Sequence, residues 1–342
     1  MSSGTPDGKP ACFHMMHAGK PLSSHGYPRP FDDAFHGKPL NIYAGKLGLY
    51  SYNPTQISSS LIRYTEQLRN LDPKLEKGHR KRHGKRQVEG LRQWKILESG
   101  KYDHRDAEEF LDIYAKCFDD LFFGGVLNGF YKIIFVKPEM MPGLDGKCSW
   151  RRPFEHGFEI QISVTNKRRS ESFRSLDKPS RRRNYISTLI HEMVHAVFQL
   201  YCCQTCTPCN DRYINEVGTS GHGMPWQKLA ISIEDVLNQC PVFIGTVAFD
   251  LGRSEAFCQD YCGDAKFLAN TSLQDSLTIR QLEGLKLDTW AFEEIEDLLR
   301  IRNMKRAAAR RRAAAARRKG LKPKKGVLGG GISKSNWPHS RH

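Results

Sequence analysis

The strongest hydrophobic pattern in this sequence lies in residues 185–200. Apolar side chains recur there every three or four positions, as on one face of an α-helix: Ile186, Ile190, Met193, Val197 and Leu200. Such a stripe predicts a helix that packs one face against a core and leaves the opposite face for other contacts. We expect this helix to be buried and central and to start at Arg182 or Asn184, after a basic loop over residues 167–183.

Two segments upstream of the central helix also have helical character. A short helix is expected over residues 54–70. A core helix is expected to begin at Asp103, a suitable N-cap that is followed by acidic side chains in the first turns, and to end at Gly124-Gly125. We expect the folded domain to begin with this core helix.

Two segments downstream of the central helix are also expected to be helical. Pro225 suits the first turn of one helix, whose apolar face would hold Trp226, Leu229, Ala230, Ile233, Val236 and Leu237. The last helix is expected to start at Asp288 or Thr289. Beyond Arg302 it becomes rich in Ala, Arg and Lys, which favours helix but offers no apolar face.

Strands are expected between the core helix and the central helix. Residues 130–136 are rich in β-branched and aromatic side chains, and residues 156–164 alternate apolar with other side chains. Joined through a loop over residues 142–153, they would form a small antiparallel sheet packed on the central helix. A further strand is expected over residues 242–251. Together with the helices, this sheet predicts an α+β fold.

Composition divides the chain into five expected regions. The hydrophobic content of 39% in 342 residues allows one large domain or two small ones. Residues 1–54 are rich in Gly, Pro, Ser and His without periodicity, which predicts disorder. The remaining regions are a helix and basic linker (55–102), the main folded domain (103–251), a C-terminal helical region (252–301) and a basic tail (302–342).

Positive charge is concentrated in the tail. Of the formal net charge of +16, residues 302–342 supply 14 Lys and Arg without any Asp or Glu, which leaves +2 for the first 301 residues. So dense a basic region is typical of proteins that bind nucleic acid, although import signals look similar. The side chains expected to contact DNA are Lys305, Arg306, Arg310, Arg311, Arg312, Arg317, Arg318 and Lys319. A second basic run, from Lys74 to Arg86, would also reach phosphate.

No apolar run of 18 residues occurs, and the first residues lack the apolar stretch of a signal peptide. We therefore expect a soluble protein that is not secreted and has no membrane partner. In a reducing compartment its ten cysteines would be thiols or metal ligands rather than disulfides.

The candidate chemistry lies on the central helix, in His191-Glu192-Met193-Val194-His195. Residues four apart on a helix project from one face, so His191 and His195 can bind one metal ion while Glu192 reaches a water on that metal. This spacing is typical of zinc hydrolases.

A catalytic zinc usually has three protein ligands and one open position, so a third ligand is needed. His222 is the best candidate, because its flanking glycines permit a tight turn and Pro225 and Trp226 begin a helix directly after it. Glu216 would complete a site of the thermolysin type, and Asp211 is a weaker alternative.

The strings His191-Glu192-Met193-Val194-His195-Ala196 and Gly221-His222-Gly223-Met224-Pro225-Trp226 resemble the SprT-like zinc metalloprotease family, to which the DNA-dependent protease Spartan belongs. The resemblance also includes residues 118–127 and 146–162 and covers about residues 104–240. It implies a zincin-like core, His191, His195 and His222 as zinc ligands, Glu192 as general base, and proteolysis of DNA-bound proteins, including covalent DNA–protein crosslinks.

A second metal site is a further possibility. Cys203, Cys206 and Cys209 have the spacing of a zinc knuckle, but a tetrahedral structural site needs four ligands. Cys258 and Cys262 would have to complete it. The alternative is a set of reduced thiols on an ordered, cysteine-rich loop.

These features predict a nuclear zinc-dependent endopeptidase that binds single- or double-stranded DNA, acts on DNA-associated proteins and so serves DNA repair. Zinc would lower the pKa of its bound water, and Glu192 would take the proton as that water attacks a peptide carbonyl. One rival is a zinc-stabilised DNA- or chromatin-binding protein with a vestigial peptidase site, but such a protein has no use for Glu192. Another is a peptidase unrelated to DNA whose tail is only an import signal.

Overall fold

The computed structural model of the chain describes residues 52–70, 84–99, 107–150, 158–163, 178–204, 207–243, 248–263 and 271–318. Residues 1–54, for which we predict disorder, lie almost wholly outside the described residues. The same holds for most of the basic run before Arg86 and for the tail from Lys319 onward. The chain divides into one compact unit that ends at Ile295 and a second that begins at Glu296. No helix among the described residues is long and apolar enough to cross a membrane.

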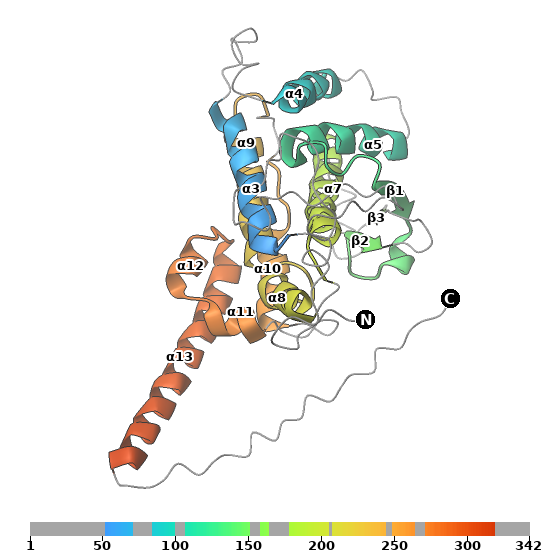
Figure 1. The fold of residues 1–342 in the computed structure, drawn as a ribbon. Helices are drawn as coiled ribbons and strands as arrows, with labels where there is room; N and C mark the ends of the chain where they lie inside the picture. Colours follow the sequence, from blue (N-terminus) through green and yellow to red (C-terminus); the bar gives the residue numbers. More distant parts are fainter. Residues whose placement is uncertain are drawn as a thin grey trace, which may run out of the picture. The chain divides into compact units, whose positions relative to one another are not determined.

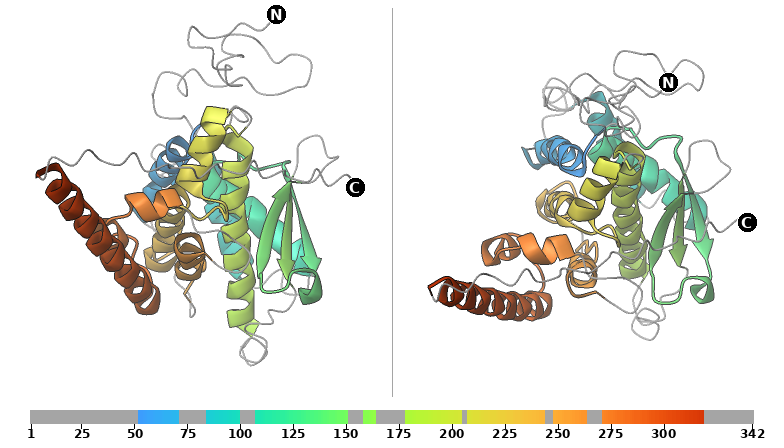
Figure 2. Two further views of the ribbon diagram at one scale, coloured as in Figure 1. Left: turned by 90° about the horizontal axis from the view of Figure 1, so that it is seen from below. Right: turned by 60° about the horizontal axis from the view of Figure 1, so that its bottom comes forward.

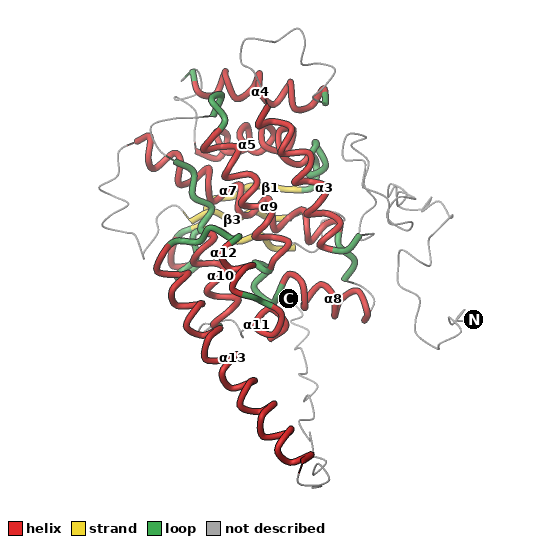
Figure 3. Tube along the Cα trace, turned by 90° about the vertical axis from the view of Figure 1, so that its left-hand side faces the viewer, coloured by secondary structure: helices red, strands yellow, loops and turns green. Residues whose placement is uncertain are grey.

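The first unit has a mixed α+β fold, mostly helical, with one small sheet (Figures 1 and 3). Before the central helix it contains α3 (Pro54–Glu66), η2 (Gln67–Asn70), α4 (Lys85–Glu98), α5 (Ala107–Phe118), a π-helical turn η4 (Asp119–Phe123), β1 (Tyr131–Val136), η5 (Pro138–Met140), β2 (Gly146–Trp150) and β3 (Phe158–Ser163). The central helix α7 (Lys178–Tyr201) is followed by α8 (Thr207–Val217), α9 (Met224–Gln239), α10 (Arg253–Cys262), α11 (Thr271–Ser276), α12 (Ile279–Glu283) and α13 (Thr289–Arg318).

The central helix α7 contacts β2 and β3 of the sheet as well as α3 and α9, and it lies beside the sheet in Figure 2. Its predicted apolar stripe is fully buried, as expected. However, α7 begins at Lys178, so the end of the expected basic loop is helical. The reason is tertiary: the guanidinium of Arg182 lies over the ring of Phe110, and that of Arg183 lies 4.2 Å from the ring centroid of Phe249. These arginines pack against aromatic rings, which a basic pattern alone does not reveal.

The sheet has the order β1-β3-β2, with β1 parallel and β2 antiparallel to β3. The prediction of an antiparallel sheet is therefore wrong for the pair β1 and β3. The error comes from β2, which occupies residues expected to be a loop. β2 pairs antiparallel with β3 on one side, and β1 pairs parallel with it on the other. β2 is an edge strand, and its residues Gly146–Trp150 lack the apolar alternation that would have identified it.

The core of the first unit extends upstream of the expected start near Asp103. In α3, which begins with a capping box between Asn53 and Gln56, Leu61 is fully buried in the same core as Leu97 of α4 and the stripe of α7. Tyr52 adds a β-bridge to Cys202 at the end of α7. The short helix expected over residues 54–70 and helix α4, which follows it, are therefore both part of the folded unit.

Downstream of α7, helix α9 is confirmed, and all six residues of its predicted apolar face are buried. Two other expectations are wrong. From Thr207 onward the expected cysteine-rich loop is helix α8. The described residues of 242–251 form no strand, because the N–H of Phe249 donates to Asn238 Oδ1 (2.8 Å) and that of Leu251 donates to Glu234 Oε1 (2.7 Å). Side chains of α9 thus replace a neighbouring strand as hydrogen-bond partners.

The last helix begins at Thr289, as predicted, and continues to Arg318. In the second unit, residues 303–315 of this helix are all exposed. These residues include five of the side chains that we expect to contact DNA: Lys305, Arg306, Arg310, Arg311 and Arg312. A sixth, Arg317, is also exposed.

Candidate metal centre

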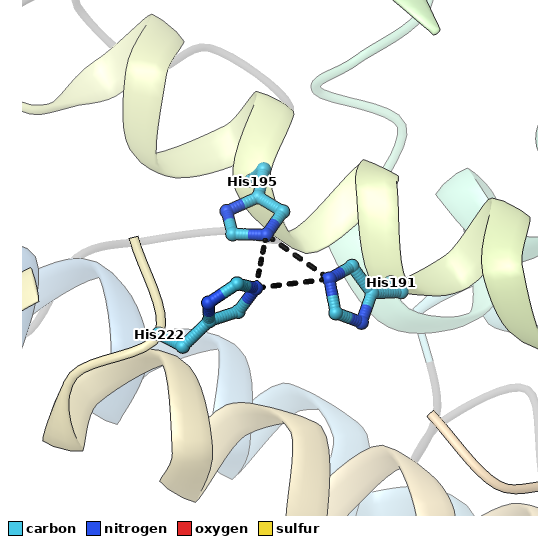
Figure 4. Close-up of side chains that lie close together, drawn as sticks. All are labelled: His191, His195 and His222. Carbon is cyan, nitrogen blue, oxygen red and sulfur yellow. Dashed lines mark hydrogen bonds between the residues drawn. The ribbon is translucent and has the colours of Figure 1, made fainter. Parts of the chain in front are cut away.

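Three histidine side chains from two segments meet on the exposed side of α7 (Figure 4). Helix α7 carries His191 and His195 one turn apart, opposite its buried stripe, and His222 comes from the turn before α9. In the part of the chain that the structure describes, these are the only three or more His, Cys, Asp or Glu side chains grouped closely enough to hold a metal ion. The structure thus brings together the three residues predicted as ligands.

The Nε2 atoms of the three rings face one another. The separations are 3.2 Å between His191 and His195, 3.1 Å between His191 and His222, and 2.9 Å between His195 and His222. Tetrahedral zinc with Zn–N bonds of about 2.0–2.1 Å places two nitrogen ligands roughly 3.3 Å apart. The spacing of the donor atoms therefore fits a zinc ion after small adjustments.

Hydrogen-bond partners determine which ring nitrogen of His191 carries the proton. Its Nδ1 lies 2.7 Å from the carbonyl oxygen of Leu251. A carbonyl only accepts, so Nδ1 must donate, and in the neutral ring Nε2 is left with a lone pair. That lone pair points at the other two rings.

The same reasoning applies to His222. Ser220 Oγ donates to Asp260 Oδ1 (2.5 Å) and lies 2.9 Å from His222 Nδ1. Since the hydroxyl proton of Ser220 is directed to the carboxylate, Oγ accepts from Nδ1–H, and His222 Nε2 also presents a lone pair. Two lone pairs about 3 Å apart repel each other unless a cation lies between them. The Leu251 carbonyl and the Ser220 hydroxyl therefore give His191 and His222 the tautomer with a proton on Nδ1 and a free lone pair on Nε2. Metal binding through Nε2 needs this tautomer.

The charge state of the rings is equally suitable. Burial lowers the pKa of His191 to about 4 and holds the pKa values of His195 and His222 well below the ordinary range. The three imidazoles are therefore neutral near pH 7, which is the form that binds a metal ion.

Trp226 and two glycines shape the site. The indole of Trp226 is fully buried, and its centroid lies 4.7, 5.5 and 4.9 Å from those of His191, His195 and His222. At Gly221 (φ 94°) a Cβ would lie 2.9 Å from the ring of His195, and at Gly223 it would lie 2.1 Å from the carbonyl oxygen of Glu216. The glycines around His222 are thus explained both by a positive φ and by close approach.

Glu192 lies beside the histidines and is also buried, at 4% exposure. One carboxylate oxygen is 3.9 Å from His191 Nε2, and the backbone of Cys148 in β2 hydrogen-bonds the carboxylate. Burial raises the pKa of Glu192 to about 8, against the opposing effect of the Cys148 hydrogen bond. A dication held by the histidines would lower this pKa. Glu192 is therefore a buried carboxyl group next to the three rings, and a metal ion there would favour its ionised form.

The site opens into a cleft of about 400 Å³. Its walls are the exposed face of α7, the start of edge strand β2 with the preceding loop from Gly143, the turn that carries His222, and residues 250–259 at the start of α10.

The other candidates from the sequence lie elsewhere. Glu216 accepts hydrogen bonds from the N–H and hydroxyl of Thr55 in α3, and Asp211 is exposed on α8. Cys258 and Cys262 hydrogen-bond each other one turn apart on α10. Within the described residues, neither this pair nor Cys203 and Cys209 belongs to a group of three potential ligands, and Cys206 lies outside those residues.

Four contributors to the site were not predicted: Ser220, Asp260, the carbonyl of Leu251 and Gly146. Ser220 lies two residues before His222, and a hydroxyl so close to a ligand is the one local signal that was available. Asp260 lies in a stretch with little pattern and reaches His222 only through folding. The Leu251 carbonyl likewise reaches His191 only through folding, and Glu234 holds the backbone of Leu251 in place.

No protein-family model matches this chain, and neither a curated protein nor a solved structure is significantly similar to it. Membership of the SprT-like family therefore stays a prediction from the motifs.

Proposed function

We propose that this chain is a zinc-dependent endopeptidase that acts on DNA-associated proteins. The observation that carries the proposal is the convergence of three neutral imidazoles beside a buried carboxylate at the wall of an open cleft. Three histidines with an open fourth position are typical of catalytic rather than structural zinc. A purely structural site would also have no use for Glu192.

The roles of the residues follow from their positions. His191, His195 and His222 would hold zinc, which supplies a water of lowered pKa and polarises the substrate carbonyl. Glu192 would accept the proton of that water and deliver it to the leaving amine. The N–H of Cys148 holds the Glu192 carboxylate, and the edge of β2 offers backbone groups with which an extended peptide can pair.

The DNA part of the proposal rests on charge. Residues 302–318 of α13 contain eight Arg and Lys and no Asp or Glu. A helix with exposed Arg and Lys side chains and no apolar face suits phosphate contacts that do not depend on the DNA sequence. Such contacts would bring the peptidase to proteins that are bound or crosslinked to DNA, in the nucleus.

Zinc content tests the ligand assignment. We expect the purified protein to contain one zinc ion and His191→Ala or His195→Ala to remove it, because two imidazoles bind zinc much more weakly than three. Elemental analysis of the three proteins measures this. Zinc retained at the wild-type level in either variant would reject the site.

Cleavage of histones or of the chain itself, with and without single-stranded DNA, tests the activity. Glu192→Gln should keep the zinc and the melting temperature but lose about 10²- to 10⁴-fold in rate, because it removes proton transfer and leaves the ligands intact. Full activity of this variant would assign the base elsewhere. Zinc binding without any proteolysis by the wild type would favour the rival, a zinc-stabilised DNA-binding protein.

A further inference from the structure

We propose that Asp260 is a positioning residue of the metal centre, which acts through Ser220 to hold His222 in the orientation and tautomer that a metal ion needs. This inference rests on the metal site proposed above but not on peptidase activity. Asp260 lies on α10, outside both motifs that identified the ligands.

His222 needs such support more than the other two histidines do. His191 and His195 project from one long helix, so their spacing is set by helix geometry. His222 lies in the irregular turn 218–223 between α8 and α9. Ordering a residue of a turn costs conformational entropy, and the contacts that order it must supply the compensating free energy.

The Asp260 carboxylate accepts hydrogen bonds from Ser220 and His222 of this turn, and the backbone of Ser220 contributes one of them. Its Oδ2 accepts the backbone N–H of His222 (2.8 Å), and its Oδ1 accepts the hydroxyl of Ser220 (2.5 Å), whose oxygen lies 2.9 Å from His222 Nδ1. The side chain has no exposed surface. One buried carboxylate therefore holds the backbone of His222 directly and its ring through a single hydroxyl.

The direction of these hydrogen bonds matters for the ring. A carboxylate can only accept from Ser220, so the Ser220 oxygen accepts from Nδ1–H and Nε2 keeps the lone pair that faces the metal. An amide at position 260 would reverse the order. Its oxygen would stay with the His222 N–H, so its NH₂ group would face Ser220 and donate to it. The Ser220 hydroxyl would then donate to Nδ1 and place the ring proton on Nε2, where it blocks the metal.

Two variants test the relay. Asp260→Asn keeps the size of the side chain but reverses the hydrogen bonds. Ser220→Ala keeps the bond from Asp260 to the His222 backbone and removes the hydroxyl that links Asp260 to the ring. The control is Asp235→Asn, which makes the same chemical change on α9 at a residue that pairs with Arg69 and Lys286.

The measurement is the zinc dissociation constant of each full-length protein, obtained by competition with a chelator. We expect Asp260→Asn and Ser220→Ala to weaken zinc binding about 10- to 100-fold, as loss of such supporting hydrogen bonds does in other zinc sites, and the control to leave it unchanged. In the cobalt-loaded proteins, the paramagnetically shifted Nδ1–H signal of His222 should exchange faster with solvent in Ser220→Ala, because its acceptor is gone.

Wild-type zinc affinity in both variants would overturn the proposal. A second outcome would also overturn it: Asp260→Asn binds zinc more weakly, while Ser220→Ala keeps the wild-type zinc affinity and an unchanged Nδ1–H signal. Asp260 would then only anchor the turn. A wild type that binds zinc but cleaves nothing would reject the peptidase function, whereas the affinity comparison would still decide the role of Asp260. A wild type that binds no metal would reject both.

Discussion

Gly146 shows how a single residue without a side chain makes room for the proposed general base. A Cβ at this position would lie 2.6 Å from Glu192 Oε1 and 2.7 Å from Thr188 Cγ2. Both contacts are too short for an ordinary packing arrangement, and neither atom belongs to a metal-binding ring. The start of β2 and the position of the Glu192 carboxylate are therefore coupled through the absence of one methyl group.

We expect Gly146→Ala to displace Glu192 and to lower the peptidase rate by up to the 10²- to 10⁴-fold that a general base contributes, while zinc content is unchanged. Gly284→Ala is the matched control, because a Cβ there would make contacts of 3.4 Å or more. Cleavage assays and metal analysis of both variants measure the two effects. An active Gly146→Ala protein would show that Glu192 is not held as tightly as this packing indicates.

Asp119, in the π-helical turn after α5, links single-residue chemistry to stability. Burial raises its pKa from 3.8 to about 7, against opposing hydrogen bonds from the backbone of Leu127 and Asn128. Between these two values the folded state holds a proton that the unfolded state has lost. The folded state then binds more protons than the unfolded state. The free energy of unfolding therefore falls as the pH rises through this range.

The slope expected from Asp119 is about 1.4 kcal/mol per pH unit between pH 4 and 7. Asp119→Asn should remove this part of the pH dependence, whatever its effect on the absolute stability. Urea denaturation of both proteins at a series of pH values gives the difference in slope. Parallel curves for the two proteins would contradict the assignment.

At the scale of elements, α3 belongs to the same hydrophobic core as α7, the helix that carries His191 and His195. It packs along α9, which begins directly after the turn that carries His222. Leu61 of α3 is fully buried in the core that also contains Trp226. A helix that the sequence analysis placed upstream of the folded domain therefore packs against the helix that follows His222.

We expect Leu61→Ala to lower the free energy of unfolding of the whole first unit by about 2–5 kcal/mol, since it removes buried methyl groups and leaves a cavity. Ser59→Ala, at an exposed position of the same helix, should change it by less than about 0.5 kcal/mol. Chemical denaturation followed by tryptophan fluorescence measures both. Equal stabilities of the two variants would mean that α3 is not part of the cooperative unit.

At the scale of the whole molecule, the concentrated positive charge and the candidate metal centre lie in separate parts of the chain. The histidines and Glu192 lie in the first unit, whereas the dense basic sequence follows residue 301. Because the basic helix has no apolar face, its removal should not affect the core of the first unit.

Deletion of residues 302–342 should therefore leave zinc content and melting temperature unchanged but weaken DNA binding for all sequences alike. The plot of log affinity against log salt should lose several units of slope, because each phosphate contact contributes about 0.7 to 0.9. A salt titration of both proteins with the same oligonucleotide measures this. An unchanged slope would mean that the segment serves only as an import signal.

The sequence by itself determined those features that depend on neighbours within a few positions. Periodicity identified α7 and α9, and the spacing of four residues put His191 and His195 on one face. The glycines and proline near His222 marked it as the third member of the group. Residue composition alone located the basic segment, and its role in binding DNA stays a prediction.

Only the tertiary structure decided which distant residues complete these local features. Three contacts join residues 27 to 60 positions apart: the parallel pairing of β1 with β3, the hydrogen bond from His191 to the Leu251 carbonyl, and the contact of Asp260 with His222. Such contacts leave no periodic trace, because they depend on how elements pack and not on how each one forms. For the same reason Gly146 and α3 gained their roles only when the chain placed them against Glu192 and the core.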